Sequence, residues 1–233
     1  MQRLFLSYIF IISIAGISYS QIFSYSNDYA AIKKRSIDKK DDIYYPKLLK
    51  RFNVDDSTLT NYQVLCLLIG FTNDPNYHPQ YDLMVEANIY HLNGIKEYSK
   101  ALALADSFLV THPVNQGTLI EISYSYYKLG NQQQAVRYTS KFYKIMKAME
   151  YSGDGKSAET AIFSLGPADG QNYIKKYLGN RIGTMGSGRD KNNYFIDILE
   201  SVSEDGKNRS TMYFNINHAL SDFEKELEEA SKK

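Results

Sequence analysis

The chain has 233 residues, of which 43% are apolar, so it is long enough to bury a substantial core. Its 27 basic and 26 acidic side chains nearly balance, whereas binding to a phosphate backbone needs a basic excess or stripe. The composition therefore argues against a nucleic-acid partner.

Residues 1–20 have the pattern of a secretory signal peptide. A single arginine precedes a mostly apolar run at 4–17, and Ser18 and Ser20 are small residues at the cleavage spacing. The run is shorter than the ~20 residues that span a bilayer comfortably. We therefore expect an exported protein, periplasmic or secreted, that begins at Gln21 and has no stable membrane insertion after cleavage. An uncleaved anchor is the alternative.

The mature chain divides by composition. Residues 21–43 are polar and charged without a helical or strand period, and we interpret them as a flexible linker. Residues 44–233 are expected to form a single compact domain, with a helical part at 44–150 and a small α+β part at 151–233. Cys66 is the only cysteine, so the core must stabilise this domain without an intrachain disulfide.

The helical part is predicted to contain six helices. Pro46 suits the first turn of a helix at 44–52, and Thr60 with Gln63 forms a capping box that opens an apolar helix to about Gly70. Turn residues then separate four longer helices. These are expected near residues 81–93, 96–111, 116–129 and 131–149.

Similar residues recur at a spacing of 34 positions in the four longer helices, a recurrence that we call the 34-residue echo. Ala101 recurs as Ala135, and Tyr90 recurs as Tyr124. This period with a small residue at a fixed place resembles the tetratricopeptide repeat, a pair of antiparallel helices that stacks on its neighbours. Thr139 departs from the pattern, because an aromatic residue is usual there.

Tetratricopeptide pairs present a groove, and the resemblance assigns six residues of this sequence to its inner face. Tyrosine rings and hydroxyl groups there would hold an extended peptide or a polar polymer. The alternative is that the C-terminal sheet packs into the groove and fills it. The six candidate binding residues are Glu86, Tyr90, Ile120, Tyr124, Tyr127 and Lys128.

The C-terminal part is predicted to be a small antiparallel β-sheet followed by a terminal helix, which makes the whole domain α+β. Alternating apolar residues and turn signals give the elements. They are a strand within 159–165, a brief helix at 169–178, a glycine-rich loop at 179–193, a hairpin of 194–202 with 209–217, and a helix from about Ala219.

The sequence contains no catalytic motif, metal-site spacing or cofactor motif that we assign. The segment Gly153–Ser157 resembles the end of a phosphate-binding loop, but Glu150 stands where that motif needs its first glycine, and we interpret the segment as a turn. Binding is thus favoured over catalysis. A cell-envelope hydrolase with a site near the sheet and the 179–193 loop, using Asp197, Arg189 and Asp190, is the alternative, and a glycan-binding protein is a third.

Four short segments carry a family resemblance: Tyr45–Leu48, Gly153–Gly155, Thr160–Ala161 and Tyr213–Asn215. Through their order and spacing, the chain from Tyr44 onward resembles a family of bacterial secreted proteins described as domain of unknown function 4919. The resemblance implies export and one compact domain, and it implies no activity. Together with the groove it leads us to expect a non-catalytic binding or scaffold protein whose partner is an unidentified protein or peptide of the cell envelope.

Overall fold

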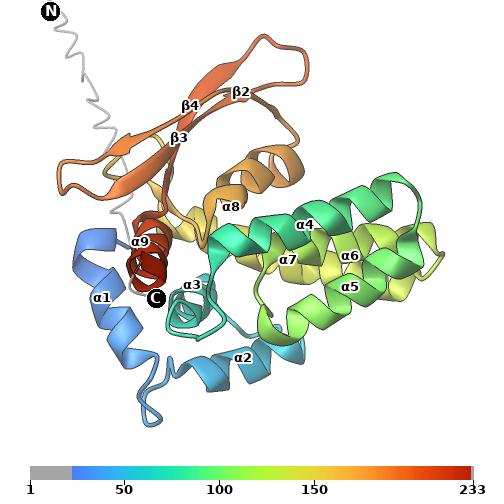
Figure 1. The fold of residues 1–233 in the computed structure, drawn as a ribbon, viewed down its shortest axis with the longest axis horizontal. Coiled ribbons are helices and arrows are strands. Elements are labelled where there is room, and N and C mark those ends of the chain that lie inside the picture. The colour runs from blue at the N-terminus through green and yellow to red at the C-terminus, as the bar shows by residue number, and fades with distance from the viewer. Residues whose placement is uncertain (1–22, 232–233) are drawn as a thin grey trace, which may run out of the picture.

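The structure, a computed structural model, describes residues 23–231, so the predicted signal peptide lies outside the described residues. Within this range, no helix has both the length and the apolar character needed to cross a membrane. Figure 1 shows the arrangement of the elements. In chain order they are α1 (Tyr25–Arg35), α2 (Tyr45–Asn53), α3 (Asn61–Phe71), α4 (Pro79–Gly94), α5 (Tyr98–Thr111), α6 (Gln116–Lys128), α7 (Gln132–Ser152), β1 (Ile162–Phe163), α8 (Pro167–Asn172), the π-helical turn η1 (Tyr173–Tyr177), β2 (Arg181–Arg189), β3 (Phe195–Val202), β4 (Arg209–Asn215) and α9 (Asn217–Ser231).

The fold is α+β, as predicted, with helices α4–α7 grouped to one side of a four-stranded sheet (Figure 1). The strand order is β1-β4-β3-β2. β3 pairs antiparallel with β2 and β4, but β1 pairs parallel with β4, placing Ile162 opposite Phe214. The prediction of a purely antiparallel sheet was therefore incomplete, because the long segment between β1 and β4 supplies the crossover that a parallel pair needs.

The prediction of a flexible linker over 21–43 is wrong for its described part. Residues 25–35 form α1, and Phe23, Ile32 and Ile43 are buried in the main core. Tyr25, Tyr29 and Ile32 follow one another at helical spacing and turn one face of α1 toward the rest of the domain. The stripe is short, and the polar residues within it and the basic residues that follow it obscured its helical period in the sequence.

The prediction of a loop at 179–193 is wrong for residues 181–189, whereas residues 190–193 lie in the turn between two strands. Residues 181–189 form β2, one of the two edge strands of the sheet, with a register shift between Ile182 and Met185. Glycine is a poor strand former, so propensity alone predicted a loop. Backbone hydrogen bonds to β3 hold the segment extended instead.

Two cores support the helical part. Helix α3 is the centre of the main core: the residues from Val64 to Phe71 are all buried, and its predicted capping box of Thr60 and Gln63 is present. A smaller core lies among α4, α5 and α6 and contains Ile89, Ala101 and Ile122. The small residue of the echo thus marks a close contact between helices.

Candidate functional site

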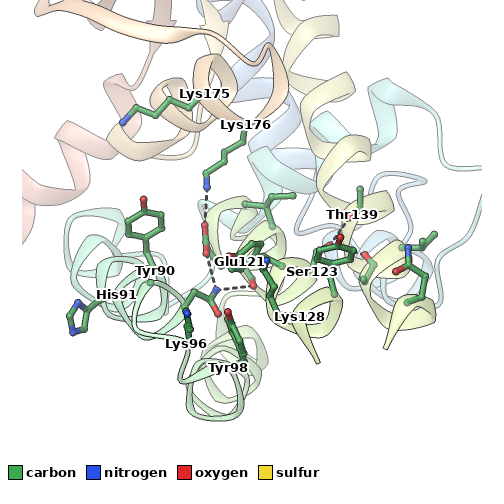
Figure 2. Close-up of a pocket in the computed structure, with 18 of the residues that line it drawn as sticks. Tyr90, His91, Lys96, Tyr98, Glu121, Ser123, Lys128, Thr139, Lys175 and Lys176 are labelled. Atoms are coloured by element: carbon green, nitrogen blue, oxygen red, sulfur yellow. Dashed lines mark hydrogen bonds and ion pairs between the residues drawn. The ribbon is translucent and has the colours of Figure 1, made fainter. Parts of the chain in front are cut away.

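A groove of about 1020 Å³ lies between the C-terminal half of α4, the α4–α5 turn, α6, the first half of α7, and η1. Figure 2 shows the side chains that line it. Among the described residues of its lining, none belongs to a strand, so the sheet does not fill the groove. The alternative of a filled groove is thereby settled in favour of an open one.

Five of the six predicted residues line this groove: Tyr90, Ile120, Tyr124, Tyr127 and Lys128. Their side chains come from α4 and α6, the two first helices of the predicted repeat pairs. Tyr90, Tyr124 and Tyr127 are 62%, 42% and 58% exposed, so their rings are available to a ligand. The echo therefore located the two helices that provide the tyrosines.

The sixth residue, Glu86, does not line the groove. It lies one helical turn before Tyr90, and its carboxylate accepts a hydrogen bond of 2.7 Å from Asn115 Nδ2. The same carboxylate lies so close to Gly117 that a side chain at position 117 would collide with it. Glu86 belongs instead to a neighbouring cavity of about 560 Å³, which also contacts Asn172 and Lys175.

Cation–π and ring–ring contacts hold the exposed tyrosines of the groove. Lys128 Nζ lies 5.2 Å from the centre of the Tyr124 ring and 5.7 Å from that of Tyr127. Tyr98 meets Tyr124 edge to face, with 6.2 Å between ring centres. These contacts orient exposed rings that would otherwise choose among several rotamers.

A polar network closes one end of the groove, where it meets the cavity of Glu86 (Figure 2). Lys176 Nζ from η1 lies 3.1 Å from Glu121 Oε1 of α6, and also 5.3 Å from the centre of the Tyr90 ring. Asn93 Nδ2 donates to Glu121 Oε2 at 2.9 Å, which satisfies the second carboxylate oxygen. The buried Glu121 thus joins α4, α6 and η1.

Sequence reasoning missed the remaining wall of the groove. Lys175 and Lys176 come from the C-terminal part, while Val136 and Thr139 come from α7. Of these residues, only Thr139 stood out in the sequence, because it departs from the tetratricopeptide pattern, which usually has an aromatic residue there. In the structure its hydroxyl oxygen lies 2.6 Å from Ser123 Oγ. No spacing in the sequence connects η1 with α6, since their contact is purely tertiary.

Burial changes the acidity of two carboxyl groups beside the groove. Loss of water raises the pKa of Glu86 to about 8, and the nearby carboxyl group of Asp169 contributes to the rise. Burial likewise raises the pKa of Asp169 to about 6, although Gln116 and the backbone N–H groups of Leu165 and Gly166 donate hydrogen bonds to it. The hydrogen bonds of Asp169 hold the start of α8 against α6.

Of the three residues of the hydrolase alternative, Asp190 lines a cavity of about 250 Å³ whose lining includes neither Arg189 nor Asp197. Burial raises the pKa of Asp197 to about 6, but Asp190 accepts hydrogen bonds from the N–H groups of Asn192 and Tyr194 in the β2–β3 turn. Arg189 donates to the carbonyl oxygen of Asn193. In the part of the chain that the structure describes, no cluster of three His, Cys, Asp or Glu side chains is placed to hold a metal ion.

The predicted turn at Gly153–Ser157 is present. Asp154 accepts hydrogen bonds from Lys156 N and Thr160 Oγ1, and Gly155 has φ of 64°, which favours glycine. The N–H of Gly155 donates to Thr160 O, so it serves the turn and not an anion.

The fold and the groove define an α+β protein with an open, tyrosine-lined groove in its helical part. The domain of unknown function DUF4919 matches residues 30–225, and the chain belongs to this family. No curated protein and no solved structure matches the chain.

Proposed function

We propose that the protein is an exported, non-catalytic binding or scaffold module that holds a segment of another polypeptide in the groove. The observation that carries the proposal is the open groove of about 1020 Å³ with three exposed tyrosines on its surface. Tyrosine is enriched at protein interfaces because it offers a large contact area with few rotatable bonds and a terminal hydroxyl group.

The helix pairs α4/α5 and α6/α7 fit tetratricopeptide-like repeats in this proposal. Support comes from the burial of both echo residues, Ala101 and Ala135, at 0% and 5% exposure. Two repeats are fewer than the three that such stacks normally need. Helix α3, which packs against α7, and helices α8 and α9, which contact α4, would supply the missing cover.

A photocrosslinking amino acid in place of Tyr127 tests the proposal in cells of the source organism. Tyr81 is the matched control position, because it is 60% exposed on α4 and does not line the groove. We expect a crosslink to another polypeptide from position 127 and none from position 81. Recovery of only free monomer from both positions would contradict a scaffold role.

Export is tested separately by the mass of the mature protein. The signal-peptide pattern predicts that the protein recovered from the envelope or medium begins at Gln21. Recovery of only full-length protein from the cytoplasm would contradict export. It would not bear on binding in the groove.

A further inference from the structure

The charge of the groove differs from the charge of the chain. The whole sequence has a net charge of +1, but the groove lining contains Lys96, Lys128, Lys175 and Lys176. Within the described part of that lining, Glu121 is the only acidic residue. The surface that a ligand meets is therefore strongly basic within a nearly neutral protein.

The one carboxylate is already engaged by the protein itself. Glu121 is 8% exposed, and its carboxylate forms an ion pair with Lys176 and accepts a hydrogen bond from Asn93. Its charge is compensated by Lys176, which leaves Lys96, Lys128 and Lys175 in excess. All three are exposed, and none of them forms an ion pair with a described residue.

The three lysines come from different elements around the groove. Lys96 follows α4 in the turn to α5, Lys128 ends α6, and Lys175 belongs to η1. Figure 2 shows Lys175 on the η1 side of the groove, across from Lys96 and Lys128. A single phosphate or sulfate group is bound by donors that converge on one point, whereas Lys175 lies across the groove from the other two lysines (Figure 2). Spaced negative charges along an extended ligand match them better.

Apolar side chains lie between the cations. Ile95 and Val136 line the groove and are each 55% exposed, and the rings of Tyr124 and Tyr127 lie beside Lys128. The rings can contact either a peptide or a sugar, but the aliphatic Ile95 and Val136 accept apolar side chains of a polypeptide and have no match in an acidic glycan.

We propose that the groove binds an acidic polypeptide segment in which aromatic or aliphatic residues alternate with Asp or Glu. The carboxylates pair with Lys96, Lys128 and Lys175, and the intervening side chains pack against the tyrosines and Val136. This inference rests on the proposed function and assigns the chemistry of its partner.

Fluorescence anisotropy with a labelled peptide of alternating glutamate and tyrosine, eight residues long, tests the inference on the mature protein. The groove variant is Lys96→Gln/Lys128→Gln/Lys175→Gln. The matched control is Lys34→Gln/Lys39→Gln/Lys40→Gln, which removes the same charge from three exposed lysines outside the groove. A peptide with glutamine in place of glutamate and a polyglucuronate oligomer are the comparison ligands.

We expect the acidic peptide to bind, with affinity reduced at least tenfold in the groove variant and less than twofold in the control. Raising NaCl from 50 to 300 mM should weaken binding, since the pairs are exposed to solvent. Equal binding of the glutamine peptide would overturn the acidic assignment and leave peptide binding intact. Binding of polyglucuronate alone, or of no ligand, would overturn the inference, and the crosslink at position 127 would then decide the proposed function independently.

Discussion

Lys176 and Glu121 are 55 positions apart in the sequence, and their charged atoms lie 3.1 Å apart across the boundary between the groove and its neighbouring cavity. The pair connects η1, in the C-terminal part, with α6, in the helical part. It therefore fixes the wall of the groove as well as the packing of the two parts.

Lys176→Ala is expected to lower the free energy of unfolding by about 1 kcal/mol, because the mostly buried Glu121 would keep only its Asn93 donor. Urea unfolding measures the change. The matched control is Lys175→Ala, which removes an exposed neighbour without an ion pair to any described residue and should change stability by less than about 0.5 kcal/mol. Equal losses from the two variants would show that the pair does not stabilise the contact.

Glu86 is expected to make the protein less stable as the pH rises. Its pKa is raised to about 8 in the folded state, so between its ordinary pKa of 4.5 and about 8 the folded state retains a proton that the unfolded chain releases. Stability is therefore lost across this window as the pH increases. We expect Glu86→Gln to remove on the order of 1–2 kcal/mol of this loss between pH 5 and 8, allowing for partial exposure.

The measurement for Glu86 is chemical unfolding at pH 5 and pH 8 for both proteins. Glu97→Gln, a half-exposed carboxyl group paired with Lys100, is the control and should leave the pH dependence near that of the wild type. If the free energy of unfolding changes equally between pH 5 and pH 8 in the wild type and in Glu86→Gln, the pKa of Glu86 is not raised.

His218 is expected to make the protein sensitive to acid. Its ring stacks on Phe163, with 4.6 Å between the ring centres, and burial lowers its pKa from 6.5 to about 3. The unfolded chain binds a proton below pH 6.5 while the folded state does not. Stability should thus fall as the pH drops from 6.5 toward 3, by at most about 1.4 kcal/mol per pH unit from this group.

Thermal unfolding of His218→Phe between pH 7 and pH 4 checks this expectation, because phenylalanine keeps the ring stacking without the titration. The variant should show a shallower acid loss than the wild type. His91→Gln, which removes an exposed histidine from α4, should follow the wild-type curve. If His218→Phe follows it as well, other groups cause the acid sensitivity.

Alanine substitutions of Tyr127 and Phe142 are expected to have very different effects on stability, because Tyr127 lines the groove and Phe142 lies in the main core. Tyr127→Ala should change stability by less than about 0.5 kcal/mol, because its ring is 58% exposed in the groove. Phe142→Ala should cost about 3–5 kcal/mol, because Phe142 is fully buried in the main core. Urea unfolding of both variants tests the contrast, and a large loss in Tyr127→Ala would mean that the tyrosine serves the fold.

Local patterns were sufficient for helices α2–α7 and for the hairpin of β3 and β4. Caps, breaks and apolar periods predicted α2–α7 to within a few residues, since these signals act between residues close in sequence. The 34-residue echo also placed Tyr90 and Tyr124 on one surface, to which the tetratricopeptide resemblance added Tyr127. The same local signals failed for α1 and β2, whose weak intrinsic preferences are overridden by packing against α3 and pairing with β3.

The sequence by itself determined the class of the fold, because helical and strand periods act along single elements, and the tyrosine-bearing side of the groove, because the 34-residue echo and the tetratricopeptide resemblance align α4 with α6. Only the tertiary structure decided that the groove is open, that η1 rather than the sheet forms one of its walls, and that Glu86 lies in the adjoining cavity. The reason is that each of these features depends on a contact between distant segments, such as Lys176 with Glu121, which no local spacing encodes.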